Sequence, residues 1–255
     1  NIPNISELKI SGVAIDDTKV LIQLKNLTSL HTLEIYEHRV DFGLLSELNN
    51  ITELTLIYPT WVENCTEISG FESLEKLTFE DGCEWLNMDG LQKIPNLKDL
   101  SLNSATIKNI HVISQMKKLE ILELSGCLVT DDESFDLEME LSELNQIDFI
   151  KGLSSLKVLD LSINGISDIN ALRNLSEVQD LSLFANYIED ISEIEKMTKL
   201  ENLNLGDNLV VDITPLSNLT KLAKLSISTN NISDISALSN LTNLVELDIS
   251  DNNIT

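Results

Sequence analysis

Few residues of this 255-residue chain have the type and spacing that catalysis or metal binding requires. The histidines and cysteines are scattered along the sequence: His31, His38, His111, Cys65, Cys83 and Cys127. None has the spacing of a zinc site or a CxxC redox motif, and the chain contains no Gly-rich phosphate loop and no GxSxG or HExxH motif. We therefore predict a protein that is not an enzyme and that holds no cofactor and no metal. The sequence leaves open a disulfide between Cys65 and Cys83.

One residue type does recur at a fixed spacing in the C-terminal half. Asparagines stand 22 residues apart at Asn164, Asn186, Asn208, Asn230 and Asn252. An asparagine amide both donates and accepts hydrogen bonds, so it can satisfy backbone groups that turn inward without a sheet partner. We predict a buried structural ladder of asparagine side chains that begins at Asn164.

The elements that must position this ladder repeat with the same period. An apolar residue opens a short alternating stretch every 22 residues, at Leu156, Val178, Leu200, Leu222 and Leu244. Alternation over so few residues is typical of a half-buried strand. After each asparagine, apolar residues recur at every third position, which favours a 3₁₀-like return segment. The pattern predicts one short strand and one tight return in each repeat.

The N-terminal half follows the same register less regularly. Six further strands are expected to open at Ile5, Leu30, Ile51, Leu74, Leu97 and Leu119, which gives eleven repeats in all. The ladder position is held in these repeats by Val13, His38, Pro59, Gly82, Ala105 and Cys127. Only His38 and, more weakly, Cys127 could replace the hydrogen bonds of an asparagine. The turn backbone of this half must therefore find water or other partners.

An acidic insertion interrupts the register between the two halves. Leu119 and Leu156 are 37 residues apart, which is fifteen more than the repeat length. The extra residues fall within 130–144, a segment with seven acids and no base. Its apolar residues alternate as in a strand, whereas its leading aspartates could cap a helix, so the sequence leaves its structure open.

The repeats resemble those of the bacterial internalin family of leucine-rich-repeat proteins, most closely in VDITPLSNLTKL at 211–222 and ISDISALSNLTNL at 232–244. The resemblance implies the α/β fold class: a leucine-rich-repeat solenoid (curved horseshoe) with a parallel β-sheet on the concave face and short 3₁₀ or irregular segments on the convex face. It also implies a cell-surface or secreted protein of a Gram-positive bacterium that binds protein partners. We expect a single domain over 1–255, with irregular repeats in 1–129, the insertion in 130–144 and regular repeats in 145–255, as part of a longer chain.

Apolar residues on the outward positions of the expected strands predict where a partner would bind. These positions are mostly polar, and the exceptions form two clusters: Tyr36, Ile57, Tyr58 and Trp61, and then Ile121, Val158, Ile163 and Phe184 beside the insertion. Contiguous exposed apolar groups usually mark an interface. We predict that Phe184 and Ile163 bind a protein ligand while the carboxylates of the insertion attract a basic patch on it. In the alternative, each is an isolated surface residue or is covered by the insertion.

The charge of the chain narrows the class of partner. Seventeen Lys and Arg against forty-two Asp and Glu give a net charge of −25, which disfavours nucleic acid and anionic membrane surfaces. No apolar stretch reaches the length of a membrane span, so we expect no direct membrane insertion. The function most consistent with these features is extracellular or cell-surface recognition of a protein. A cytoplasmic adaptor or regulatory subunit and a structural spacer are the alternatives, and the sequence does not specify the ligand or the oligomeric state.

Overall fold

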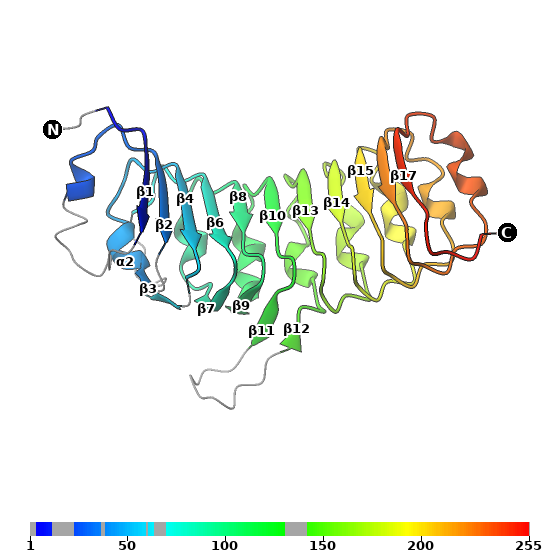
Figure 1. Ribbon diagram of the computed structural model, residues 1–255, viewed down its shortest axis with the longest axis horizontal. Coiled ribbons are helices and arrows are strands. Elements are labelled where there is room, and N and C mark those ends of the chain that lie inside the picture. Colours follow the sequence, from blue (N-terminus) through cyan, green and yellow to red (C-terminus); the bar gives the residue numbers. More distant parts are fainter. Residues whose placement is uncertain are drawn as a thin grey trace. The chain divides into compact units, whose positions relative to one another are not determined.

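The computed structural model describes residues 4–11, 23–36, 39–59, 61–63, 70–130 and 142–254 (Figure 1). The chain divides into two compact units, the first made of 1–119 with 127–142 and the second of 120–126 with 143–255. In this described part, no helix is long and apolar enough to cross a membrane. The expectations for Val13, His38 and Cys65, and for all but the ends of the insertion, fall outside the described residues.

The first unit contains a parallel sheet with one strand from each of the first five repeats. Its strands, in spatial order, are β1 (Glu7–Ser11), β2 (Thr32–Tyr36), β4 (Glu53–Ile57), β6 (Lys76–Glu80) and β8 (Asp99–Ser101). Each strand begins two residues after its predicted opening residue. Leu33, Leu54, Leu77 and Leu100 lie in register on neighbouring strands and are fully or almost fully buried. The alternation in the sequence thus places a continuous leucine row in the core.

The first unit contains a second parallel sheet (Figure 1), whose strands begin at the ladder position or within two residues after it. Its strands in this unit are β3 (Arg39–Asp41), β5 (Trp61–Glu63), β7 (Cys83–Asn87), β9 (Ala105–Lys108) and β11 (Leu128–Thr130). A further two-residue strand, β12 (Ser142–Glu143), lies at the boundary of the units. The periodicity of the sequence does not predict this sheet. This sheet provides hydrogen-bond partners for the turn backbone of repeats that have no ladder asparagine. The turns of this half therefore do not depend on water alone.

Short helical turns complete the repeats of the first unit. They are α2 (Phe42–Leu45), η2 (Leu91–Lys93) and η3 (Ile110–Gln115). Asp41 caps α2, because its carboxylate accepts a hydrogen bond from Leu44 N at 3.0 Å. Phe42 packs edge to face against Phe71 and Phe79, with ring centroids 5.8 and 6.1 Å apart. These rings fill the core between the sheets and the returns.

The second unit has a sheet of six parallel strands. They are β10 (Ile121–Glu123), β13 (Val158–Asp160), β14 (Asp180–Ser182), β15 (Asn202–Asn204), β16 (Lys224–Ser226) and β17 (Glu246–Asp248). The returns are 3₁₀ helices, as the three-residue apolar spacing predicts: η4 (Asp148–Ile150), η5 (Asn170–Asn174), η6 (Ser192–Lys196), η7 (Thr214–Leu216) and η8 (Ser236–Asn240). Both units are therefore stretches of leucine-rich-repeat solenoid, and the predicted fold class is confirmed.

The recurrent asparagines hold the strand exits of the second unit together. The side-chain nitrogen of Asn208 donates to Leu205 O at 3.1 Å in its own repeat and to Leu183 O at 2.9 Å in the preceding one. Its side-chain oxygen accepts from Ile188 N at 3.0 Å. The same set of bonds recurs at Asn186, Asn230 and Asn252, and Asn164 donates to Leu124 O and Leu161 O, both at 2.9 Å. Each amide thus ties one turn to the turn before it.

In the first unit, Cys127 occupies the ladder position and makes one comparable bond. Its thiol donates to Leu102 O at 3.2 Å, and Leu102 lies 25 residues earlier, as Leu161 does from Asn186. Pro59 and Ala105 are buried at the same position of other repeats, and Gly82 adopts a positive φ of 88°. The strands of the second sheet begin at these residues or within two residues after them: β9 starts at Ala105 itself, β7 directly after Gly82 and β5 two residues after Pro59.

Candidate partner-binding face

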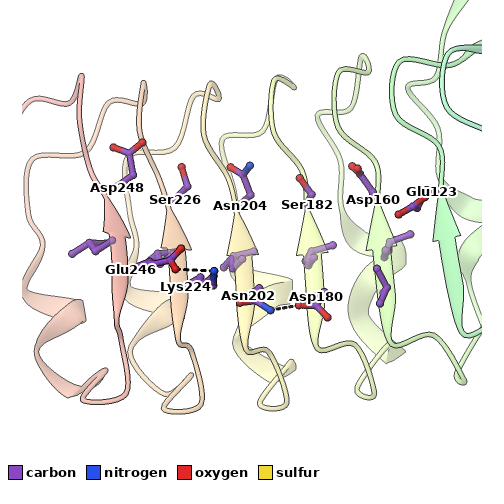
Figure 2. Close-up of a pocket in the computed structure, with 16 residues that line it drawn as sticks. Glu123, Asp160, Asp180, Ser182, Asn202, Asn204, Lys224, Ser226, Glu246 and Asp248 are labelled. Carbon is purple, nitrogen blue, oxygen red and sulfur yellow. Dashed lines mark hydrogen bonds and ion pairs between the residues drawn. The ribbon is translucent and has the colours of Figure 1, made fainter. Parts of the chain in front are cut away.

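The outward face of the sheet in the second unit carries an open groove of about 660 Å³, which we call the strand-face groove (Figure 2). Two rows of side chains cross its strands. The first row consists of Val158, Asp180, Asn202, Lys224 and Glu246, and the second of Glu123, Asp160, Ser182, Asn204, Ser226 and Asp248. The alternation of each strand places these residues outward while the leucine between them points inward; this leucine is buried in β10 to β16, and in the last strand Leu247 is exposed.

The groove is acidic. Among the described residues that line it, five carboxylates stand against the single ammonium group of Lys224. That group pairs with Glu246 on the neighbouring strand, Nζ to Oε1, at 2.7 Å. Asn202 donates to the carboxylate of Asp180 (Figure 2). The surface therefore presents carboxylate oxygens together with amide and hydroxyl groups, which suits a basic or hydrogen-bonding partner.

Hydrogen bonds hold two of the carboxylates in fixed positions. One oxygen of Asp160 accepts from Ser162 N at 2.9 Å and from Ser162 Oγ at 2.5 Å. Asp248 accepts in the same way from the hydroxyl and backbone N–H of Ser250, at 2.6 and 3.0 Å, and these bonds lower the pKa of its carboxyl below the usual value. The Asp248 carboxylate is thus charged at neutral pH and preset in orientation.

The predicted residues Ile163 and Phe184 lie together on this face, at the exits of β13 and β14. Ile163 N donates to Phe184 O at 2.7 Å, so the two residues are direct neighbours. Their side chains are 59% and 36% exposed. A Cβ on Gly206 would lie 3.3 Å from a ring carbon of Phe184, which shows that the ring extends toward the next repeat, where a glycine leaves room for it.

Ile163 also has an unusual backbone conformation. Its φ is 56°, in the left-handed region that β-branched residues avoid because of steric crowding at Cβ. The equivalent residues Ala185, Asp207, Thr229 and Asp251 share this conformation, so the repeat imposes it. The choice of isoleucine at such a position, with most of its side chain exposed, favours a role outside folding.

Ile121 and Val158 face each other in register on β10 and β13 and are half-buried. They flank the carboxylates Glu123 and Asp160, which lie two residues further along the same strands. The structure thus brings all four predicted residues of this cluster onto one unit, on both sides of a carboxylate pair.

The cluster predicted in the first unit is smaller than expected. Tyr36 and Tyr58 are 40% and 56% exposed. Ile57, predicted to be exposed, is only 4% exposed, because in register it lies between Tyr36 of β2 and Glu80 of β6. The backbone of Trp61 lies in β5, and its side chain is outside the described residues.

Tyr36 belongs to a small polar network on β1 and β2. Lys9 pairs with Glu34 at 2.6 Å, and this bond lowers the pKa of the Glu34 carboxyl. The hydrogen bond with Glu34 raises the pKa of Tyr36. These contacts orient the tyrosine and give this face a polar character.

A further exposed apolar group, which the outward strand positions do not predict, lies just after the ladder asparagines of the second unit, at what we call the exit edge. Tyr187, Leu209 and Val211 are 56%, 40% and 59% exposed. Tyr187 and Leu209 directly follow ladder asparagines, where other repeats carry Gly165, Asn231 and Asn253. The residue directly after the ladder asparagine, compared from repeat to repeat, is the sequence signal that distinguishes them.

The described cysteines have no features of a reactive site. Cys83 and Cys127 are buried and unbridged. Burial raises the pKa of the Cys83 thiol to about 12, and its Sγ donates to Trp85 O at 3.2 Å. Among the residues that the structure describes, no three His, Cys, Asp or Glu side chains come together as metal ligands.

Comparison with known proteins shows which proteins share this architecture. A family model described as leucine-rich repeats (2 copies) matches residues 176–218, and no curated protein matches the chain. An internalin, InlF, from Listeria monocytogenes has 28% sequence identity and a TM-score of 0.76 over 91% of this chain, which spans 64% of that structure. A leucine-rich-repeat protein of Leptospira interrogans has 23% identity and a TM-score of 0.73 over all of this chain and 68% of its own, and shares the fold.

The family of this chain is established by its likeness to a further solved structure. Internalin C2 from Listeria monocytogenes is 35% identical, with a TM-score of 0.64 over 72% of this chain and 75% of its own length. The asparagine ladder, the short strands and the 3₁₀ returns agree with this likeness. The chain belongs to the internalin family of leucine-rich-repeat proteins.

Proposed function

We propose that this protein is a non-enzymatic recognition module that binds a protein partner through the strand face of its second unit. The observation that carries the proposal is the pair Ile163 and Phe184, which are exposed neighbours just beyond the ends of β13 and β14, two of the strands that carry the strand-face groove. Exposed apolar neighbours reduce solubility and commonly form the centre of an interface.

The conformation of Ile163 supports the same proposal. A β-branched residue with a φ of 56° lowers stability, and a smaller or polar residue would fit the repeat better. An advantage in binding would explain why isoleucine stands at this position.

The setting that we propose is the bacterial cell surface or its surroundings, where the module would adhere to or recognise another protein. The proposal is supported by membership of the internalin family. The acidic groove is consistent with this role, since carboxylates attract a basic partner and raise its association rate.

A capture experiment with three forms of the protein tests the proposed function. The unmodified protein, the double variant Phe184→Ser, Ile163→Ser, and the control Tyr187→Ser, Val211→Ser are immobilised, and solubilised host-cell surface proteins are passed over each. The control removes a similar exposed apolar group from the exit edge. We expect one set of proteins to be retained by the unmodified form and the control and lost by the first variant. Equal retention on all three surfaces would contradict binding through this face.

A further inference from the structure

We propose that the strand-face groove binds an extended segment of the partner that carries two Lys or Arg residues six positions apart, one bound by Asp160 and the other by Asp248. This inference rests on the proposed function and specifies the chemistry of the partner. It is drawn from the charges, the neutral groups between them and the dimensions of the groove.

One end of the groove holds two neighbouring carboxylates. Glu123 and Asp160 stand directly opposite each other on β10 and β13 (Figure 2). Like charges at paired positions of a sheet destabilise it, and a cation placed against both would remove the repulsion. The cation favoured here belongs to a side chain, because Phe184 and Ile163 border the same end and would contact the apolar stem of an Arg or Lys or the residues next to it.

The other end is marked by Asp248 on β17. Lys224 is already paired with Glu246, at 2.7 Å, so the nearby ammonium group is engaged away from Asp248. Ser250 holds the Asp248 carboxylate through its hydroxyl and backbone N–H, and the side chain of Ser228 also hydrogen-bonds to it. A fixed carboxylate binds a cation without first losing side-chain freedom.

Between the two ends, the same row carries neutral hydrogen-bonding groups, Ser182, Asn204 and Ser226. The side-chain oxygen of Asn204 accepts from Gly206 N at 3.0 Å, so its NH₂ group is the part that can donate to a ligand. Hydroxyl and amide groups suit the alternating N–H and C=O groups of an extended backbone. The middle of the groove therefore fits peptide backbone, and its ends fit positive side chains.

The distance between the ends sets the spacing of the basic residues. Asp160 and Asp248 occupy equivalent positions four strands apart in one sheet. At about 4.8 Å per strand this is about 19 Å. An extended chain advances about 3.3 Å per residue, so about six residues cover that distance. Six is an even number, which places both side chains on the same face of the segment.

The test uses two peptides of identical composition and charge. In Ac-Thr-Arg-Thr-Ser-Val-Thr-Ser-Arg-Thr-NH₂ the arginines are six apart, and in Ac-Thr-Thr-Ser-Arg-Thr-Val-Arg-Ser-Thr-NH₂ they are three apart and face opposite sides. Any general attraction to a chain of net charge −25 is the same for both. Titration of each peptide by isothermal calorimetry or fluorescence anisotropy gives its Kd.

Two charge-matched variants locate the site. Asp160→Asn, Asp248→Asn removes both proposed contacts, and Asp190→Asn, Asp212→Asn removes two carboxylates at the start of the returns. All four aspartates accept a backbone N–H two residues later, at 2.8 to 3.0 Å, and asparagine keeps that bond. Both variants should therefore fold equally well.

The unmodified protein and the Asp190, Asp212 variant should bind the six-apart peptide about tenfold more tightly than the three-apart peptide. The Asp160, Asp248 variant should lose this preference. Equal affinity for both peptides, or loss of preference in the other variant instead, would overturn the inference. If the inference fails while Phe184→Ser, Ile163→Ser still abolishes capture of a protein, the proposed function stands and only the basic segment is excluded.

Discussion

At the scale of single residues, two neighbouring positions in the repeats of the second unit have opposite effects on stability. The buried ladder asparagine satisfies backbone groups of two successive turns, so it stabilises the fold. The residue before it adopts the left-handed conformation, which suits Asp or Gly and does not suit isoleucine. The ladder is therefore the residue-level cause of the regular repeats, and Ile163 departs from that regularity.

Replacement of Asn208 by leucine should lower the free energy of unfolding by roughly 1 to 3 kcal/mol, because buried carbonyl and N–H groups lose their partner. Asn208 donates to Leu183 O and Leu205 O and accepts from Ile188 N. Urea unfolding measures the change. The control is Asn231→Leu, at an exposed asparagine directly after the ladder residue Asn230. Its free energy of unfolding should stay within about 0.5 kcal/mol of the unmodified protein. Equal effects of the two substitutions would mean that the ladder bonds do not stabilise the turn.

Replacement of Ile163 by asparagine should raise the free energy of unfolding by about 1 kcal/mol, because asparagine tolerates a positive φ. The control Val211→Asn removes an equally exposed β-branched side chain that is not among the residues with positive φ. Thermal unfolding should show a higher midpoint for the first variant only. A lower midpoint for Ile163→Asn would show that the isoleucine stabilises the fold and would weaken its assignment to binding.

At the scale of elements, the strands and returns follow from sequence periodicity and the second sheet does not. The eleven predicted strands, five in the first sheet of the first unit and six in the second unit, each begin two residues after the predicted opening residue. This agreement arises because a short alternating stretch can bury its apolar side in only one way. The strands β3, β5 and β11 have three residues each, too few for periodicity to distinguish them from turns. Their β-branched residues Val40, Val62 and Val129 were the available signal.

Truncation of Ile107 in β9 to alanine should lower the free energy of unfolding by roughly 2 to 5 kcal/mol, because the side chain is fully buried in the second sheet. The next residue provides the control, since Lys108→Ala removes no buried apolar group. Denaturant unfolding of the two variants measures the difference. An Ile107→Ala variant as stable as the control would show that this sheet does not support the first unit.

The 3₁₀ returns of the second unit predict a pH effect. Arg173 of η5 donates to Glu193 of η6, with Nη2 2.7 Å from Oε1, and this bond lowers the pKa of the Glu193 carboxyl. A lowered pKa stabilises the fold above the unfolded value of about 4.3, and the contribution disappears as pH falls through the lower folded value. Glu193→Gln should therefore destabilise the protein at pH 7 and have less effect below about pH 4. The exposed variant Glu195→Gln is the control, and an effect of Glu193→Gln that is independent of pH would contradict the assignment.

At the scale of the whole molecule, the sequence predicts a class of function more readily than a binding surface. A net charge of −25 disfavours nucleic acid and anionic membrane surfaces and favours a neutral or basic partner. The residues Ile163 and Phe184 could be placed on the strand face by counting from each leucine. Ile57 could not, because its burial depends on Tyr36 and Glu80 on other strands. The acidic groove is formed by six strands in register, so its shape could not be predicted from the sequence of any single repeat.

The central claim is that a partner covers the strand face of the second unit. Hydroxyl-radical footprinting of the protein with and without a captured partner tests it directly, because the method reports the exposure of individual side chains. We expect oxidation of Phe184 and Ile163 to fall in the complex while Tyr187 and Val211, at the exit edge and at least as open to solvent in the free protein, keep their reactivity. Protection of Tyr187 and Val211 with Phe184 and Ile163 unchanged would contradict the account and move the binding surface to the exit edge.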